Sequence, residues 1–494
     1  MIDAQFLAWL QSPAAYRCVL IEAAARVDGV ETMIYMGTKS YTTSPADSPA
    51  NTQYLPIATV GTLFTERLSL EGDGALSAGD LEIDNTAGVR DAWAGAGYVW
   101  KNREIRAYIG DIRWPRADFR MIFNGIVADI APSGRSALLL KLRDKLQRLN
   151  TAITEAKLGG DTEQKDALLP FAIGQVSNIT PLPVNPALLI YGYHCASAEG
   201  VIANEGRDNG APVAMTSNPA SGTVTLESMP AGAVTLSVKG DNTSGYCDTA
   251  ATMCRRLATR YGKAADRFAD ADLDLANIGA FDVAHPQPMG LYSTDRLNVL
   301  AACQMLLGSL GAQLVMSRLG LMRLIQVALP GTGTPFVIRP EHMIDGTLQP
   351  TARTDVVGAV KLGFAKNWTV QDAGTLANLP EVHKALFTEE WLTTTKTDAA
   401  TLSTYRLNAE PVQIDTMLLT RADADAEAQR RLDLWKVPRT TYEFDGVPEL
   451  LTLELGQAVT VYSPRFGMAG GVSGIVISLA PDWNTGRVKV GFLV

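Results

Sequence analysis

Short hydrophobic runs alternate with turn-forming residues along most of the chain, a pattern typical of many short β-strands. The clearest signal lies near the start, where strand-like residues 16–24 and 30–36 flank the dipeptide Asp28-Gly29. Asp-Gly favours the two-residue turns that join antiparallel strands, so this segment predicts a hairpin. Further strands are expected at residues 63–70, 80–84, 105–109 and 119–130. Together with a short helix that starts at Asp3, these elements predict a mostly β domain, a barrel or split barrel.

The hydrophobic period changes in the middle of the chain. One helix is marked by three hydrophobic residues at helical spacing: Met253, Leu257 and Tyr261. Asp248 is the expected cap of this helix, and a second helix is expected over residues 294–307. A hairpin over residues 313–327 follows, so this part of the chain predicts an α+β unit.

The remaining segments also favour strands. Several prolines disfavour a helix before residue 190, and they occupy positions 170, 181, 183 and 186. The last third has one helical pattern, at residues 423–435. Its final strands are expected at residues 440–444, 451–455, 458–462, 474–479 and 487–492. A basic cluster at residues 141–148, in which charges alternate with leucine, is interpreted as a helix face.

The pattern as a whole predicts an α+β protein that is mostly β, with several small β-barrel-like domains around one helix-containing α+β domain. Four segments are expected: 1–155, an N-terminal β-barrel-like domain; 156–240, a small β module; 241–330, the α+β domain; and 331–494, a C-terminal β domain with one helix and closing barrel strands.

Charge and composition narrow the possible functions. The 494 residues carry a formal net charge of −9, which repels phosphate and argues against stable nucleic-acid binding. The start, Met-Ile-Asp-Ala, lacks the basic region of a secretory signal, so we expect folding in the cytoplasm of the producing cell. Residues 297–317 are uncharged and long enough to span a membrane. Their polar residues and two glycines instead favour a buried helix followed by a strand, so no membrane span is expected.

Candidate metal and nucleophilic residues are scattered. The five cysteines form no Cys-x-x-Cys motif, and no two of the four histidines share helical spacing, so neither a metal site nor a cofactor is expected. His194 and Cys195 are adjacent, but catalytic partners are usually distant in sequence, and we interpret them as a strand end.

Two acidic clusters are the best candidates for acid–base chemistry. Asp270, Asp272 and Asp274 alternate like a calcium loop, but Leu275 and Phe281 occupy the positions where an EF-hand needs Gly and Glu. A solvated linker or a helix start is the alternative interpretation. A second cluster opens the helix expected near residue 423, and it comprises Asp423, Asp425 and Glu427. Carboxylates are favoured at the start of a helix, so no catalytic residues are predicted.

Four aromatic residues crowd one short span of the first domain: Trp93, Tyr98, Trp100 and Trp114. One interpretation places them in a barrel core with a mixed rim. The other, which we adopt as a prediction, makes them a subunit interface, because aromatic residues are enriched at interface cores.

Three stretches in a fixed order carry a family pattern: residues 100–127, with Phe-Asn-Gly-Ile-Val at 123–127; residues 171–181 followed by 223–240; and residues 430–488. Together they resemble the tail hub and tail-tip (baseplate hub) proteins of tailed bacteriophages and gene transfer agents. In such proteins, similar stretches belong to a barrel near the N-terminus, a small β insert before a helical hub domain, and a closing barrel.

The resemblance implies a structural subunit of the virion, at the tail tip or baseplate, made in the cytoplasm of the host bacterium. It implies a homo-oligomeric ring, commonly a trimer, that closes the tail tube. The implied partners are distal tail or tail tube proteins, tail fibre or spike proteins, and the C-terminus of the tape-measure protein. Two alternatives remain open: a distal tail ring protein or receptor-binding component, and a tail-associated peptidoglycan hydrolase.

Overall fold

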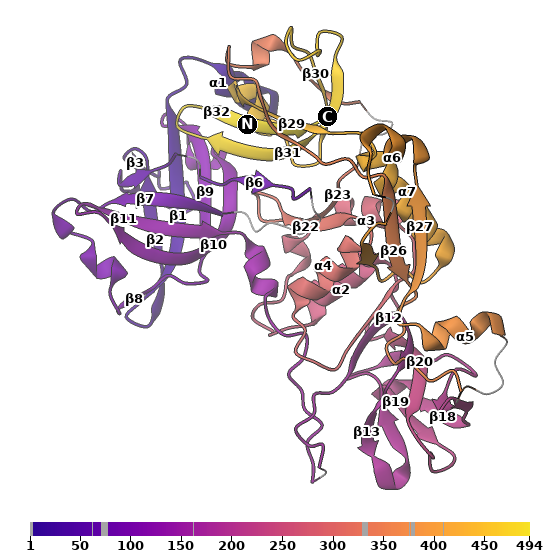
Figure 1. Cartoon of the computed structure of the whole chain (residues 1–494). Coiled ribbons are helices and arrows are strands. Elements are labelled where there is room, and N and C mark those ends of the chain that lie inside the picture. The colour runs from indigo at the N-terminus through magenta and orange to yellow at the C-terminus, as the bar shows by residue number, and fades with distance from the viewer. Residues whose placement is uncertain are drawn as a thin grey trace. The chain divides into compact units, whose positions relative to one another are not determined.

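A computed structural model describes residues 3–61, 63–70, 78–161, 163–328, 334–374, 376, 381–408 and 410–494. They form two compact units, each assembled from separated stretches (Figure 1). Unit 1 comprises Met1–Arg148, Val315–Thr354 and Arg439–Val494, and unit 2 comprises Leu149–Leu314 and Asp355–Pro438. The fold is α+β and mostly β, as expected. The last expected segment contributes to both units, and the finer division into four remains a prediction.

The first sheet of unit 1 has eight strands. Its order is β2 (Val30–Gly37), β1 (Arg17–Val27), β9 (Glu104–Asp111), β10 (Arg120–Ser133), β11 (Ala137–Arg143), β7 (Ala78–Asp84) and β5 (Ala58–Thr59), and β8 (Tyr98–Val99) also pairs with β1. The segment before β5 hydrogen-bonds to both outer parts of this sheet. The Gly37 amide donates to the Leu55 carbonyl (2.7 Å), and the Asp84 amide donates to the Ile57 carbonyl (2.8 Å). This segment therefore bridges the two outer parts of the sheet, which gives the sheet its barrel-like form.

The predicted hairpin is confirmed. Val27 pairs with Val30 across the two-residue loop Asp28-Gly29, where both residues have positive φ, +47° and +89°. Positive φ at both central residues is the requirement of a type I′ turn, whose twist matches that of the flanking strands. The turn thereby fixes the register between β1 and β2.

The helix interpretation of residues 141–148 is wrong for residues 141–143 and holds only as a short 3₁₀ helix after them. Residues up to Arg143 belong to β11, and Lys145–Leu149 form a 3₁₀ helix, η4. The leucines at every second position of β11 are buried: Leu138, Leu140 and Leu142. A period of two places one face of a strand against a core, whereas a helix needs a period near 3.6.

The second sheet of unit 1 is built largely from the C-terminal stretch. Its order is β24 (Phe336–Ile338), β30 (Ala458–Val461), β31 (Val472–Asp482), β32 (Arg487–Leu493), β29 (Thr440–Gly446) and β25 (Gln349–Arg353), and β6 (Glu66–Arg67) pairs with β31. The strand expected at residues 451–455 is wrong, because Pro448–Thr452 form a 3₁₀ helix, η9. Pro448 favours this because its fixed φ suits the first position of a helical turn. The helix α1 (Asp3–Gln11) contacts η9.

Unit 2 combines three sheets with six α-helices in its described residues. One sheet contains β17 (Ala211–Pro212), β16 (Arg207–Asp208), β20 (Val234–Asp241), β12 (Phe171–Ile179) and β21 (Gly290–Ser293), with β15 (Ala198–Val201) on β20. A second contains β13 (Leu182–Asn185), β14 (Ile190–Gly192), β19 (Thr223–Leu226) and β18 (Met215–Asn218). The third contains β27 (Leu392–Thr397), β26 (Ala359–Phe364) and β28 (Gln413–Asp415).

The helices of unit 2 are α2 (Ala250–Arg260), α3 (Leu275–Ala284), α4 (Val299–Gly308), α5 (Glu381–Thr388), α6 (Ala399–Tyr405) and α7 (Arg421–Trp435). The cap of α2 is Thr249 and not Asp248, since the Thr249 side chain accepts a hydrogen bond from the Thr252 amide. Two short two-stranded ladders complete the described strands: β22 (Ala312–Met316) with β23 (Met322–Gln326), and β3 (Tyr41–Thr42) with β4 (Gln53–Tyr54).

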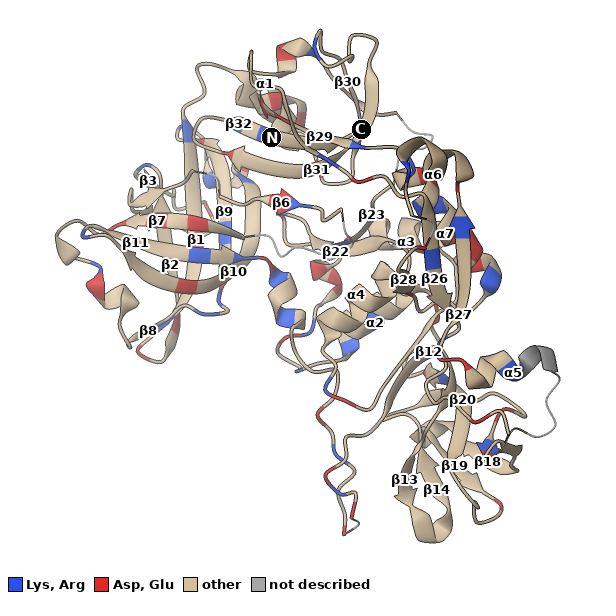
Figure 2. Ribbon diagram, in the orientation of Figure 1, with Lys and Arg blue, Asp and Glu red and all other residues tan. Residues whose placement is uncertain are grey.

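Within the described ranges, no helix combines the length and apolar character needed to cross a membrane. Residues 297–317, the uncharged stretch of the sequence, divide into α4 and β22, as expected. Figure 2 shows Lys and Arg interspersed with Asp and Glu over both units, with no single stripe of one sign.

Candidate subunit interface

Three of the four aromatic residues expected at an interface lie together in unit 1. The 3₁₀ helix η2 (Asp91–Ala94) carries Trp93, and β8 brings Tyr98 and Trp100 next to it. The ring centroids of Trp93 and Trp100 are 5.6 Å apart, and Tyr98 stacks with Trp100 at 6.3 Å. Trp100 is only 2% exposed, and its indole N–H donates to the Trp93 carbonyl at 2.8 Å. Trp100 thus anchors the group in the barrel, whereas Trp93 and Tyr98 stay half-buried.

Trp114 belongs to a different cluster. It packs beside Trp9, with ring centroids 4.5 Å apart, and its carbonyl accepts a hydrogen bond from the Tyr41 hydroxyl at 2.9 Å. The buried residues of this cluster are Cys18, Leu20, Tyr41, Tyr54 and Phe119. The interface prediction for the four aromatics concerns contacts with other chains, so it stays a prediction.

Exposed hydrophobic residues lie at the tip of the β1–β2 hairpin. Val30 is 66% exposed and Met33 39%, and Val99 of the neighbouring strand β8 is 45% exposed. Because β2 is an outer strand of its sheet and Leu55 pairs with it at Tyr35 and Gly37, the described residues leave its edge open near Val30 and Met33, next to the apolar side chains of the hairpin. The sequence did not predict this surface, since the strand-like residues of β2 do not show which of them are exposed.

The first acidic cluster stabilises helix starts. The Asp274 side chain accepts a hydrogen bond from the Asn277 amide (3.0 Å) and caps α3. Asp272 accepts from the Ala269 amide (3.2 Å) within the 3₁₀ helix η7 (Asp270–Asp272). The helix-start interpretation is confirmed. In the described parts of the chain, no three His, Cys, Asp or Glu side chains are grouped so that they could hold a metal ion.

The second acidic cluster is only partly a helix start. Asp423 accepts from the hydroxyl of the capping residue Thr420, as expected. Glu427 is instead 6% exposed and sits between two arginines, 2.7 Å from Arg430 Nε and 2.6 Å from Arg431 Nε. Its interpretation as a helix-start charge is wrong, because Glu427 lies beyond the first turn of α7. The buried carboxylate pairs with guanidinium groups three and four residues later, which lie on the same face of α7.

The adjacent His194 and Cys195 do not form a nucleophilic pair. His194 is buried, and its Nδ1 accepts a hydrogen bond from the Ala172 amide at 3.1 Å, which leaves the proton of a neutral ring on Nε2. That Nε2 lies 3.8 Å from the buried Asp241 carboxylate. Burial raises the pKa of the Cys195 thiol to about 11, so the thiol stays protonated near neutral pH. The arrangement is that of a structural polar cluster.

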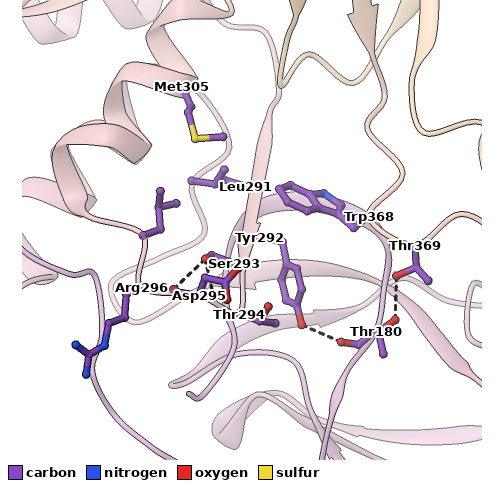
Figure 3. Close-up of a pocket in the computed structure, with 11 residues that line it drawn as sticks. Thr180, Leu291, Tyr292, Ser293, Thr294, Asp295, Arg296, Met305, Trp368 and Thr369 are labelled. Atoms are coloured by element: carbon purple, nitrogen blue, oxygen red, sulfur yellow. Dashed lines mark hydrogen bonds between the residues drawn. The ribbon is translucent and has the colours of Figure 1, made fainter. Parts of the chain in front are cut away.

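A surface hollow of about 540 Å³ lies in unit 2 (Figure 3). The Tyr292 hydroxyl donates to the Thr180 carbonyl at 3.0 Å, and the hydroxyls of Thr180 and Thr369 are 2.9 Å apart. The Arg296 side chain extends away from the other labelled residues in Figure 3. Asp295 is the single carboxylate among the described residues that line the hollow, whereas glycoside hydrolysis generally uses two.

No family model and no curated protein matches the sequence. The chain is similar in structure to the 43 kDa tail protein of prophage MuSo2 from Shewanella oneidensis, at 13% identity over 97% of this chain and 98% of that chain, with a TM-score of 0.43. It is similar to a tail protein from Neisseria meningitidis MC58, at 9% identity over 96% of each chain, with a TM-score of 0.41.

A prophage tail protein from Listeria monocytogenes EGD-e is also similar, at 8% identity over 96% of this chain and 94% of that chain, with a TM-score of 0.38. These three proteins come from phage or prophage tails or are named tail proteins, the class that the sequence of this chain resembles.

Proposed function

We propose that this chain is a structural subunit of the tail tip or baseplate hub of a tailed bacteriophage, and not an enzyme. The main support for this proposal is the position of the family-like stretches in the fold. Residues 100–127 and 430–488, two of the three stretches that resemble tail hubs, contribute strands to the two sheets of unit 1. The stretches lie far apart in sequence, and the fold gathers their strands into one compact unit.

Open sheet edges support a role in assembly. The outer strand β2 carries the exposed Val30 and Met33, and all five residues of the outer strand β25 are exposed. Unpaired strand edges and exposed apolar side chains are costly in a protein that stays alone, and ring closure between copies would bury them.

In the proposed role the chain forms a homo-oligomeric ring, a trimer, at the tail tip or baseplate of the virion. The ring closes the tail tube and joins distal tail or tail tube proteins on one side to tail fibre or spike proteins on the other. The C-terminus of the tape-measure protein reaches its lumen. Trp93, Tyr98, Trp100 and Trp114 belong to the proposed subunit contact, with Trp93 and Tyr98 as the members that are exposed enough to touch a neighbour.

Native mass spectrometry and negative-stain imaging test this role. The purified chain, alone and co-expressed with the other tail proteins encoded beside it, should give closed rings, with three copies expected. A particle that stays monomeric at high concentration in both preparations would refute the proposal. A zymogram on host peptidoglycan provides the second arm, since lysis by the pure chain would establish the hydrolase alternative.

A further inference from the structure

One face of α2 carries only hydroxyl and guanidinium side chains. Positions three and four apart lie on the same side of a helix. The side chains on this face are Thr252, Arg255, Arg256, Thr259 and Arg260. The opposite face is buried and includes Ala251, Cys254, Leu257 and Ala258. The polar face forms one wall of a cavity of about 540 Å³ in unit 2. The other walls are Ser244, Tyr246, Cys247, Phe268 and Asp270.

The walls of this cavity are held by contacts inside unit 2. Arg256 donates to the carbonyls of Ser244 (3.1 Å) and Gly245 (2.8 Å) and to the buried Asp241 carboxylate (2.5 Å). The Phe268 amide donates to the Ala258 carbonyl at 2.9 Å. Arg256 is therefore committed to the fold, and the cavity is formed before any ligand arrives.

The charges in the cavity do not cancel. Arg256 is neutralised by Asp241, and Arg255 by Asp270 at 3.0 Å. The Arg260 side chain is exposed and makes no hydrogen bond or ion pair with the described residues. The Tyr246 hydroxyl is buried and likewise has no hydrogen-bond partner in the described parts of the chain. One guanidinium of the cavity wall thus remains for a ligand, whereas the Tyr246 hydroxyl is closed off from solvent.

We propose that this cavity binds a single carboxylate from an acidic segment of a partner protein. The single excess positive charge of the cavity can neutralise one carboxylate, but it cannot neutralise both charges of a phosphate dianion. The planar donors of Arg260 suit the two oxygens of a carboxylate, and the half-exposed Arg255 is placed on the same helix face to assist. The volume admits an acidic side chain with its neighbouring backbone. This inference does not depend on the tail assignment.

A fluorescein-labelled tetraglutamate peptide is the probe, and fluorescence polarisation with the whole chain is the measurement. Arg260→Glu should weaken binding at least about tenfold, because a charge-assisted hydrogen bond is replaced by repulsion. Lys263→Glu is the matched control, since it makes the same charge change at an exposed position outside the cavity, and it should alter the affinity less than about twofold. Both positions are exposed, so both variants should fold.

Three results would overturn the proposal. The first is an equal loss in the two variants, which would indicate general charge attraction. The second is competition by inorganic phosphate that is stronger than competition by acetate at equal ionic strength, which would make the cavity a phosphate site. The third is the absence of any binding by the unaltered chain at millimolar peptide.

Discussion

Asp241 connects several polar side chains of unit 2. Its carboxylate is fully buried and accepts hydrogen bonds from the Thr243 amide (3.0 Å), the Thr243 hydroxyl (2.7 Å) and Arg256 (2.5 Å). Burial raises the pKa of this carboxyl, but His194, Thr243 and Arg256 together act more strongly in the other direction. The pKa of Asp241 therefore lies well below its usual range, and the ionised form is part of the folded state.

Replacing this carboxylate tests its role. Asp241→Asn should lower the free energy of unfolding at pH 7 by about 3 kcal/mol, because Arg256, with a side chain only 10% exposed, loses its counter-charge. The folded-state pKa lies below the unfolded value, so the stabilisation is present above about pH 4 and is lost as the pH falls through the folded pKa.

Urea unfolding measures this at pH 7 and at several values below about pH 4. The difference in free energy of unfolding between the unaltered chain and Asp241→Asn should become smaller as the pH falls. Asp166→Asn is the control, because Asp166 is 74% exposed in its ion pair with Lys157 and should have little effect. A difference in free energy of unfolding that is the same at every pH would contradict stabilisation by the ionised Asp241 carboxylate.

At the scale of elements, the chain uses turns and caps to fix local structure and buried ion pairs to join distant segments. The type I′ turn at Asp28-Gly29 sets the register of β1 and β2. On α7, Glu427 orients two arginines so that Arg431 donates to the Gly308 carbonyl (2.6 Å) and Arg430 to the Leu310 carbonyl (3.2 Å). Gly308 is the last residue of α4 and Leu310 lies just beyond it, so these arginines link α7 to the end of α4.

The turn gives a direct prediction. Gly29→Ala should destabilise the chain by about 1 kcal/mol, because φ of +89° strains any residue with a Cβ, although no atom lies within 4 Å of the added carbon. Gly61→Ala has the same free space without the positive φ, and it should change stability by less than about 0.5 kcal/mol. Thermal unfolding of both variants measures the difference. Equal effects at the two positions would show that backbone strain is not the cause.

The Glu427 contacts predict a local effect. Glu427→Gln should cost about 2–4 kcal/mol, because two guanidinium groups lose their shared counter-charge in a buried position. Hydrogen exchange should report faster opening at the end of α4 as well as in α7. Asp433→Asn removes an exposed ion pair of the same helix, with Lys436, and should be nearly neutral. Unchanged exchange at Gly308 would refute the proposed link between the helices.

Local patterns were sufficient for some elements and insufficient for others. The β1–β2 hairpin was predicted because Asp-Gly between two strand-like runs encodes it within a few residues. A helix start at Asp274 was one of the open interpretations, but no helix was placed over the residues of α3, since glycine and asparagine in its interior weaken the helical pattern. The buried position of Glu427 depends on the packing of α7 against segments far away in sequence. The separation of Trp114 from Trp93 likewise depends on contacts between distant segments of unit 1. No local pattern of residues encodes such contacts.

At the scale of the whole molecule, each unit draws on separated parts of the chain. Unit 1 takes its first sheet from the N-terminal stretch and most of its second sheet from the C-terminal stretch. The exposed edge of β2 and the apolar side chains on it are the features through which such a unit would meet other copies in the proposed assembly.

Assembly should therefore respond to charge at this edge. Val30→Lys and Met33→Lys should weaken self-association at least about tenfold while leaving the melting temperature unchanged, because lysine on an edge strand opposes pairing between chains. Val283→Lys, at an 84% exposed position of α3, is the matched control and should assemble normally. Sedimentation velocity measures both. Normal assembly of the two β2 variants would remove this edge from the proposed interface.

The pairing of β6 with β31 has a consequence for synthesis. Glu66–Arg67 is made early, but its partner strand and three further strands of the same sheet belong to the last stretch, Arg439–Val494. At ribosomal rates of roughly 5–20 residues per second, the nascent N-terminal part waits for roughly tens of seconds before these strands emerge. A translation product that stops before Arg439 lacks four strands of that sheet, which exposes it to proteases and chaperones before it can join a particle.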